Sequence, residues 1–216
     1  MNVALLSNQG TPKGANTIQF IVESLKLQKR SAAFIASQPD ADRYYFSQAQ
    51  EIYKSFGVDL DTYLDFESGF NKAVLDVVLN KPIVHLSGGN TYRFLNSIRS
   101  RSLSDLLVKY AHAGGVFIGV SAGAMLLTPT IESAVLCGDV NLVGLEDLTS
   151  LGLVSFMFYP HAVKQQTEID KAKELVNSKK IEMYLCNDDE SVVIVNDQVQ
   201  VFGSPILIKP ANLSAQ

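Results

Sequence analysis

Two patterns of apolar positions alternate along this chain of 216 residues. The first is a short, nearly continuous run of apolar and small residues, which is typical of a strand buried on both faces. Runs of this kind are NVALLS (2–7), SAAFIAS (31–37), PIVHLSGG (82–89) and GVFIGVS (115–121). The second pattern places apolar residues at i, i+3, i+4 and i+7, which predicts a helix with one buried face. It occurs at 18–25, 70–77 and 103–110.

Strands that alternate with helices in this way predict βαβ units, and therefore a mostly parallel sheet with helices on both faces. In the last third of the chain, the strand-like runs LVSFMFYP (153–160) and IEMYLCND (181–188) flank a helical stretch. Two further runs, SVVIV and QVQVF, flank Asn196-Asp197, which predicts a β-hairpin. We therefore expect an α/β fold of three layers, with a doubly wound, mostly parallel, flavodoxin-like sheet and a C-terminal β-hairpin. No repeat or linker interrupts the pattern, so residues 1–216 are expected to form a single domain.

The charge and the cysteine content exclude several classes of function. A formal net charge of −4 argues against a nucleic-acid partner, because binding phosphates requires a basic surface. Cys137 and Cys186 are too few for a disulfide framework, and no Cys/His cluster predicts a metal site. The N-terminus lacks the basic segment of a signal peptide, and no run approaches the roughly 18 apolar residues of a membrane span. The chain is therefore expected to be cytoplasmic, without a membrane partner, a metal or an organic cofactor.

The strand at 115–121 leads directly into GVSAGAML (119–126), which contains the pattern G-x-S-x-G centred on Ser121. A strand that stops abruptly before a helix can present a serine on a tight turn as a nucleophile, and small neighbours let the backbone segments approach closely. Such a turn also aims the first N–H groups of the helix, that of Ala122 included, at a developing oxyanion. The alternative is a plain strand-to-helix connection in which Ser121 caps the helix.

A second turn of this kind lies in HLSGGNTYRF (85–94), which also follows a strand and opens a helix. In a parallel sheet it therefore lies at the same edge as the serine turn. Gly88 and Gly89 leave their N–H groups accessible, and one of them would complete a two-donor oxyanion hole. The alternative is a turn in which Asn90 or Thr91 caps the helix, or a weak site for phosphate or another anion.

A serine nucleophile needs a base, and the chain has three histidines. His161 follows Pro160 at the end of a strand-like run, so it is expected on a loop at the edge that carries the serine. His112 falls late in a helix, where a cation suits the helix dipole, and His85 lies within an apolar strand, where packing is expected. His161 is therefore the predicted base.

An acidic residue should orient the imidazole. The segment CNDDESVVIV (186–195) offers three carboxylates ahead of a strand, and two further candidates are among the acids between the serine and the histidine. The candidates are Asp188, Asp189, Glu190, Glu132 and Asp139. The residues alone leave this choice open.

Three motifs, SGGNT (87–91), GVSAGAM (119–125) and YPH (159–161), resemble in identity and order those of the dipeptidase E and cyanophycinase family of serine peptidases. The resemblance implies an open α/β sheet similar to that of class I glutamine amidotransferases, with serine in place of their cysteine. It favours Asp189 as the acid, because the family often has an acidic residue just before a late strand. The catalytic residues that it implies are Ser121, His161 and Asp189. The oxyanion hole is expected at Gly88, Gly89 and Ala122, and substrate binding at Asn90 and Thr91.

The sequence therefore predicts a serine peptidase that hydrolyses small peptides through an acyl-enzyme, and a homodimer is left open. The residues around His161 differ from the family, so its preference for an N-terminal aspartate does not carry over. Arg43, Arg93 and Lys164 could each pair with a substrate carboxylate, although ordinary surface cations are the alternative. Two other functions are considered. One is a non-catalytic flavodoxin-like protein that holds an anion. The other is a glutamine amidotransferase-like hydrolase, which is disfavoured because neither cysteine occupies the tight turn at Ser121, which we call the elbow.

Overall fold

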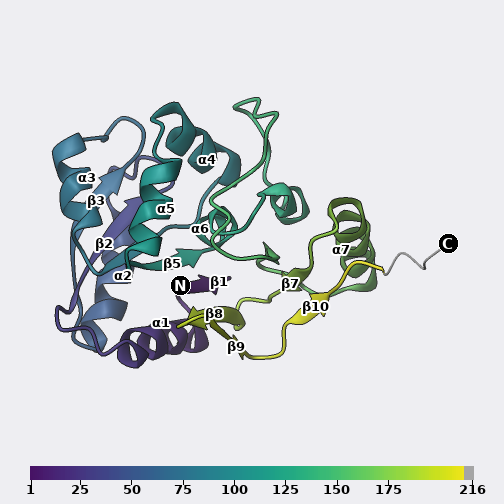
Figure 1. Cartoon of the computed structure of the whole chain (residues 1–216), viewed down its shortest axis with the longest axis horizontal. Coiled ribbons are helices and arrows are strands. Elements are labelled where there is room, and N and C mark those ends of the chain that lie inside the picture. Colours follow the sequence, from purple (N-terminus) through teal and green to yellow (C-terminus); the bar gives the residue numbers. More distant parts are fainter. Residues whose placement is uncertain (212–216) are drawn as a thin grey trace.

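The centre of the molecule is a seven-stranded sheet, shown in Figure 1 in a computed structural model that describes residues 1–211. Its strands are β1 (Asn2–Leu6), β2 (Ser31–Ala36), β3 (Asp59–Asp65), β4 (Ile83–Leu86), β5 (Val116–Val120), β8 (Ser191–Val195) and β9 (Gln198–Phe202). Their order across the sheet is β3-β2-β4-β5-β1-β8-β9. The first five are parallel, whereas β8 runs antiparallel to β1 and β9 antiparallel to β8. The predicted mostly parallel α/β sheet is confirmed.

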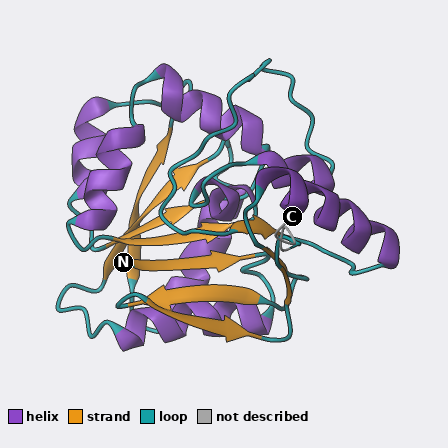
Figure 2. Cartoon of the chain, turned by 45° about the vertical axis from the view of Figure 1, so that its right-hand side comes forward, coloured by secondary structure: helices purple, strands orange, loops and turns teal. Residues whose placement is uncertain are grey.

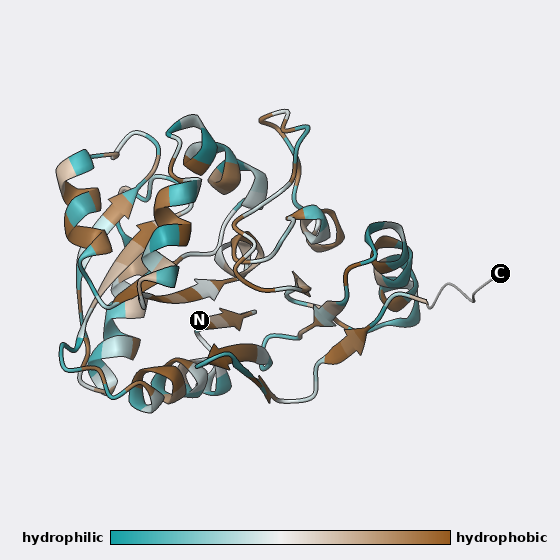
Figure 3. Cartoon of the chain, in the orientation of Figure 1, coloured by the Kyte–Doolittle hydropathy of each residue, from teal (hydrophilic) through white to brown (hydrophobic). Residues whose placement is uncertain are grey.

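Helices pack on both faces of this sheet, which gives three layers (Figure 2). One face carries α1 (Pro12–Ser24) and α2 (Tyr44–Ser55); the other carries α3 (Lys72–Leu79), α4 (Thr91–Ser100), α5 (Ser104–His112) and α6 (Ala122–Leu126). The strand β1 shows why: Val3 and Leu5 point into the core under α3–α6, whereas Ala4 and Leu6 point into the core under α1 and α2. Successive side chains of a strand alternate between faces, so a strand that is apolar throughout is buried on both. Figure 3 shows these strands mostly in brown.

The strand-like runs near 157 and 184 do form strands, but in a second, smaller sheet. There β6 (Met157–Tyr159) pairs with β7 (Met183–Leu185), which also pairs with β10 (Ile206–Ile208). The helix α7 (Gln166–Lys179) packs on this sheet through Ala172 and Val176. These strands have three residues each, and they hydrogen-bond to one another rather than to a strand of the main sheet.

Two elements between the second and third predicted strands have weak patterns. The helix α2 buries only Phe46, Ala49 and Tyr53, and β3 reads DLDTYLD, in which charged and apolar residues alternate over the first three positions. Alternation of this kind suits an edge strand, and β3 is one. The predicted hairpin between β8 and β9 is confirmed, with Asn196 and Asp197 both at positive φ in its turn.

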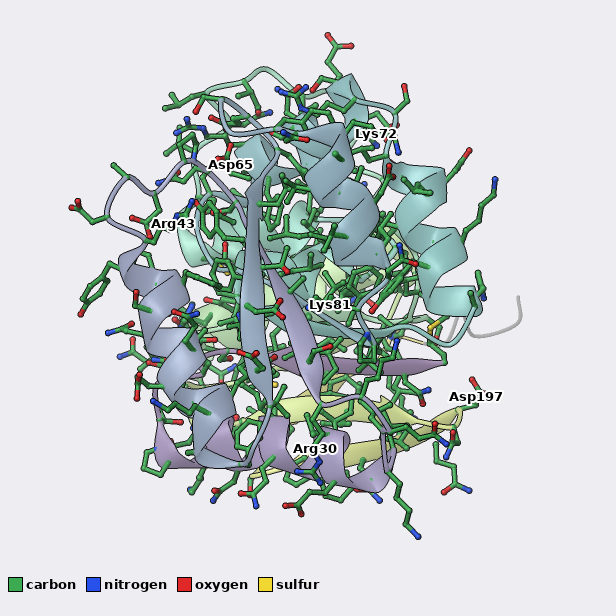
Figure 4. The ribbon with its side chains drawn as sticks, turned by 90° about the vertical axis from the view of Figure 1, so that its left-hand side faces the viewer. Arg30, Arg43, Asp65, Lys72, Lys81 and Asp197 are labelled. Atoms are coloured by element: carbon green, nitrogen blue, oxygen red, sulfur yellow. The ribbon has the colours of Figure 1, made fainter. Side chains whose placement is uncertain are left out.

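The carboxyl ends of the parallel strands meet at one edge, where the loops after β1, β2, β4 and β5 lie together. Figure 4 looks onto β3 at the side of the sheet, with Arg43 at the beginning of α2 and Arg30 near its other end. No helix among residues 1–211 is long and apolar enough to cross a bilayer.

Candidate active site

Ser121 occupies a strained turn between β5, which ends at Val120, and α6, which begins at Ala122. Its backbone has φ 51° and ψ −110°, a region that residues other than glycine rarely adopt. The turn is fixed on both sides, because the Ser121 N–H donates to the Leu6 carbonyl at 2.8 Å and the Ser121 carbonyl accepts from Met125 N–H at 3.0 Å. The hydroxyl makes no capping hydrogen bond to α6. The helix-capping alternative for this serine is therefore wrong, and its Oγ is available for chemistry.

Two glycines make this sharp turn possible by allowing backbone contact. A Cβ on Gly119 would lie 2.5 Å from the Gly123 carbonyl oxygen, and a Cβ on Gly123 would lie 2.2 Å from the carbonyl oxygen of Leu86. Both contacts are with main-chain atoms, which cannot rotate away as a side chain would. The G-x-S-x-G pattern thus reflects packing of the elbow against β4.

His161 lies beside the serine, with its Nε2 2.9 Å from Ser121 Oγ. It follows β6 and Pro160 and has a left-handed backbone, at φ 59°. The backbone N–H of His161 donates to Ser7 Oγ at 3.3 Å, and that buried hydroxyl donates in turn to the Cys186 carbonyl at 3.0 Å. The same carbonyl accepts from Ala162 N–H at 2.9 Å. Ser7, at the carboxyl end of β1, thus connects the loop of the histidine to the loop that begins at Cys186.

The carboxylate against the imidazole belongs to Asp188, whose Oδ1 lies 2.5 Å from His161 Nδ1. The expectation that Asp189 occupies this position is wrong. The Asp189 side chain points to Lys13, with 3.6 Å between Oδ2 and Nζ. The reason is the turn itself, because the Asn187 Oδ1 accepts from Asp189 N–H at 2.9 Å and directs consecutive side chains to different sides.

The other acidic candidates have structural partners elsewhere. Glu132 pairs with Lys179, and the Asp139 carboxylate accepts from the N–H of Thr91 at 2.8 Å. Glu190 is buried and forms an ion pair with Lys164. None of these three carboxylates contacts the imidazole.

The pair of Lys164 and Glu190 holds three segments together next to the site. Lys164 Nζ donates to Glu190 Oε1 at 2.6 Å and to the Ser204 carbonyl at 2.8 Å. Glu190 Oε2 accepts from the N–H of Asn187 at 2.9 Å, one residue before Asp188. We call this group the Lys164–Glu190 clamp. It joins the segment after the histidine to the loop of the acid.

The glycine turn after β4 lies next to the serine. The Gly88 carbonyl accepts from Ser37 Oγ at 2.6 Å and from Ser87 Oγ at 2.9 Å. Its peptide bond is trans, so the Gly89 N–H points the opposite way. A Cβ on Gly88 would lie 3.5 Å from the Cβ of Ser121, which places the turn directly against the elbow.

Asn90 and Thr91 do not line the cavity at Ser121, contrary to the expectation that they bind substrate. The Asn90 side chain caps α4 by accepting from Arg93 N–H at 2.9 Å, and it donates to the Val140 carbonyl at 3.1 Å. Thr91 is fully buried. These residues serve the turn, which leaves the glycines before them as the part that faces the site.

A cavity of about 810 Å³ opens beside Ser121, bounded by the loop after β1, the loop after β2 and one side of α2. Of the two other histidines, His85 is buried in β4 as predicted, and burial lowers its pKa to about 3. His112 ends α5, and neither borders the cavity. Of the cysteines, Cys186 is fully buried, and burial raises the pKa of Cys137 to about 12, so both thiols stay protonated at neutral pH.

The sequence does not predict a role for Ser7 or the contact between Lys164 and Glu190. The available signal for Ser7 is a polar residue at the carboxyl end of a fully apolar strand, the position from which loops of a parallel sheet build sites. No local pattern pairs Lys164 with Glu190, which lie 26 residues apart.

The chain is similar to known peptidases over most of its length. The model of "Peptidase family S51" matches residues 3–202. Peptidase E from Escherichia coli is 30% identical over 168 residues, which are 74% of this chain and 69% of that protein. An uncharacterized peptidase from Pasteurella multocida is 25% identical over 179 residues, 81% of this chain and 86% of the other. A Listeria monocytogenes crystal structure assigned as a peptidase E superposes with a TM-score of 0.72 at 21% identity, covering 93% of this chain and 96% of that one.

Proposed function

Because the chain belongs to peptidase family S51, we propose that Ser121, His161 and Asp188 are the catalytic triad of a serine peptidase that hydrolyses small peptides. One observation carries this proposal: a single imidazole bridges a serine hydroxyl at 2.9 Å and a carboxylate at 2.5 Å. This is the order of groups that serine hydrolases use on unrelated folds. The cavity of about 810 Å³ is within the size range of small-molecule sites and suits a short peptide.

In the acylation step, His161 Nε2 accepts the hydroxyl proton as Ser121 Oγ attacks the carbonyl carbon of the scissile amide. The Asp188 carboxylate holds the Nδ1–H tautomer and stabilises the imidazolium that forms. The imidazolium then protonates the leaving nitrogen, the C–N bond breaks, and an acyl ester on Ser121 remains.

The tetrahedral intermediate carries a negative charge on the former carbonyl oxygen. We assign the N–H groups of Gly89 and Ala122 as its donors. The orientation of the Gly88 carbonyl supports the first, because the Gly89 N–H lies on the other side of the same peptide. The position of Ala122 as the first residue of α6 supports the second, since a first-turn N–H has no acceptor within its own helix.

Deacylation repeats these transfers with water. His161 takes a proton from the water as its oxygen attacks the ester carbonyl, and it returns that proton to Ser121 Oγ as the ester bond breaks. The products are the free serine and a carboxylic acid, which releases its proton to the solvent at neutral pH. The protonated, buried thiols of Cys137 and Cys186 support serine rather than cysteine as the nucleophile.

A fluorophosphonate probe tests the proposal, because it forms a covalent bond only with an activated serine. We expect one added mass on the peptide that contains Ser121, and none in Ser121→Ala. That variant should keep the parent's thermal unfolding and lose kcat on a dipeptide substrate by about 10⁶-fold. Labelling at another serine, or turnover by Ser121→Ala at the parent rate, would refute the assignment.

A further inference from the structure

The groups of the proposed site follow one another along the edge of the main sheet. In the strand order β2-β4-β5-β1, the loop of Asp40 follows β2, the glycine turn follows β4, Ser121 follows β5, and Ser7 with its bound His161 lies at β1. His161 protonates the leaving amine, so the leaving group lies on the β1 side of the serine. The acyl part of the peptide therefore extends the other way, past the glycine turn towards β2 and α2.

The wall on that side is acidic. Asp40, in the loop after β2, and Glu51, on α2, both border the cavity, and no lysine or arginine among residues 1–211 does. Neither carboxylate has a cation within 4.0 Å in the described structure. The half-buried Asp40 is held in place by Tyr45 N–H, which donates to its Oδ2 at 3.3 Å. Glu51 also borders a second hollow with Arg30 and Lys54, so the larger role falls to Asp40.

Each cation that could hold a substrate carboxylate has a partner elsewhere. The Arg43 guanidinium lies over the Tyr63 ring, 4.7 Å from its centroid, and Figure 4 shows this arginine near β3. Arg93 binds Glu67 through two nitrogens. Lys164 belongs to the Lys164–Glu190 clamp. A negative side chain on the acyl residue would meet two carboxylates here and no cation.

We propose that this acidic wall binds a positive charge on the acyl residue of the substrate, either its α-ammonium group or a lysine or arginine side chain, with Asp40 as the main acceptor and Glu51 as the second. The inference rests on the proposed function, since it uses the direction that His161 gives to the leaving group. It excludes peptides that begin with aspartate as preferred substrates.

Four peptides separate the two sources of charge: lysyl-leucine, norleucyl-leucine, and the N-acetyl form of each. Norleucine keeps most of the lysine side chain without the ammonium group. We expect kcat/KM for N-acetyl-norleucyl-leucine, which has no positive charge, to be at least about tenfold below that of the best charged peptide. If acetylation causes the loss of kcat/KM, the bound group is the α-ammonium. If replacing lysine by norleucine causes it, the bound group is the lysine side chain. Aspartyl-leucine should also be cleaved at least about tenfold more slowly than norleucyl-leucine.

Two variants test which carboxylates act. The measured quantity is kcat/KM for the best charged peptide divided by kcat/KM for N-acetyl-norleucyl-leucine. This ratio should fall about tenfold in Asp40→Asn and by less in Glu51→Gln. Asp42→Asn and Glu174→Gln remove exposed carboxylates that do not border the cavity, and they should keep the parent ratio. Thermal unfolding establishes that each variant is folded. Asp40→Asn and Glu51→Gln are made as separate single variants, so each carboxylate is tested by itself.

The outcomes separate this inference from the function on which it rests. Serine-dependent cleavage with no charge preference, a preference for aspartyl-leucine, or a ratio unchanged in both Asp40→Asn and Glu51→Gln would overturn the inference alone. Failure of the fluorophosphonate to label Ser121, together with no cleavage of any of the five peptides, would overturn the proposed function and the inference with it.

Discussion

The two halves of the proposed site are positioned by different kinds of contact. In the nucleophile half, the elbow at Ser121 rests on main-chain contacts with β1 and β4, and the glycine turn lies against it. In the base half, His161 and Asp188 lie on loops next to the smaller sheet. Hydrogen bonds that involve the Ser7 hydroxyl, the Cys186 carbonyl as an acceptor and the Lys164–Glu190 clamp hold these loops.

This difference predicts how each half responds to substitution. Main-chain contacts in a packed sheet cannot be lost without moving strands, so a substitution that displaces the backbone of the nucleophile half should be seen first as a loss of stability, whereas removal of the Ser121 hydroxyl alone leaves these contacts in place. Side-chain hydrogen bonds between loops can be removed one at a time, so damage to the base half should be seen as a loss of rate in a protein that stays folded.

Among the changes that separate the two halves, the largest effect is expected from Asp188→Asn. The amide can no longer hold the Nδ1–H tautomer or stabilise the imidazolium, and kcat should fall by about 10³- to 10⁴-fold with little change in KM. Asp189→Asn is the matched control one residue away, and it should change kcat by less than about threefold. Steady-state kinetics on a single dipeptide decides between them, and a larger loss in Asp189→Asn would reverse our assignment of the acid.

A change within the elbow should instead act on stability. Gly123→Ala places a Cβ 2.2 Å from the Leu86 carbonyl oxygen, and the backbone has to move, so unfolding should require about 3 kcal/mol less free energy. Gly144→Ala is the control for backbone strain without a steric clash, since Gly144 has φ 68° and nothing within 4 Å of a Cβ. It should lower the free energy of unfolding by about 1 kcal/mol. Denaturant titration measures both. Equal losses would mean that the elbow is not closely packed.

The smallest effect is expected from Ser7→Ala, which removes the acceptor for His161 N–H. We expect kcat to fall by about tenfold and KM to stay within about twofold, because the imidazole loses alignment while the cavity keeps its shape. Ser191→Ala removes an equally buried hydroxyl that contacts Thr17 rather than His161, and it should cost stability without this loss of kcat. If both variants lower kcat equally, Ser7 has no specific role in positioning the base.

The main sheet was predictable because its strands are apolar at consecutive positions and its helices have one apolar face. The helix α2 and the strand β3 were not, because one buries few apolar residues and the other alternates as an edge strand does. Nor could the pattern reveal the second sheet, since a run of apolar residues such as that ending at Tyr159 does not specify which strand it pairs with.

For the site, the predicted positions agree with the structure where they depend on local geometry. A turn between a strand and a helix predicted the position of Ser121, and a proline after a strand predicted that of His161. The choice between Asp188 and Asp189 depends instead on the Asn187 side chain, which turns consecutive carboxylates to different sides. Asn90 shows a related limit, because a residue that can cap a helix can also bind a ligand, and only the contact with Arg93 N–H distinguishes the two.

The first strand, β1, lies inside the main sheet between β5 and β8, so each residue that is its register partner in these strands is at least 114 residues away along the chain. Pairing over such separations is slow and raises the contact order of the fold. Ser7 at the end of β1 also holds His161, and Asp188 precedes β8. During synthesis, therefore, the three residues of the proposed triad cannot come together until Asp188 has left the ribosome, and a shorter nascent chain carries no assembled triad.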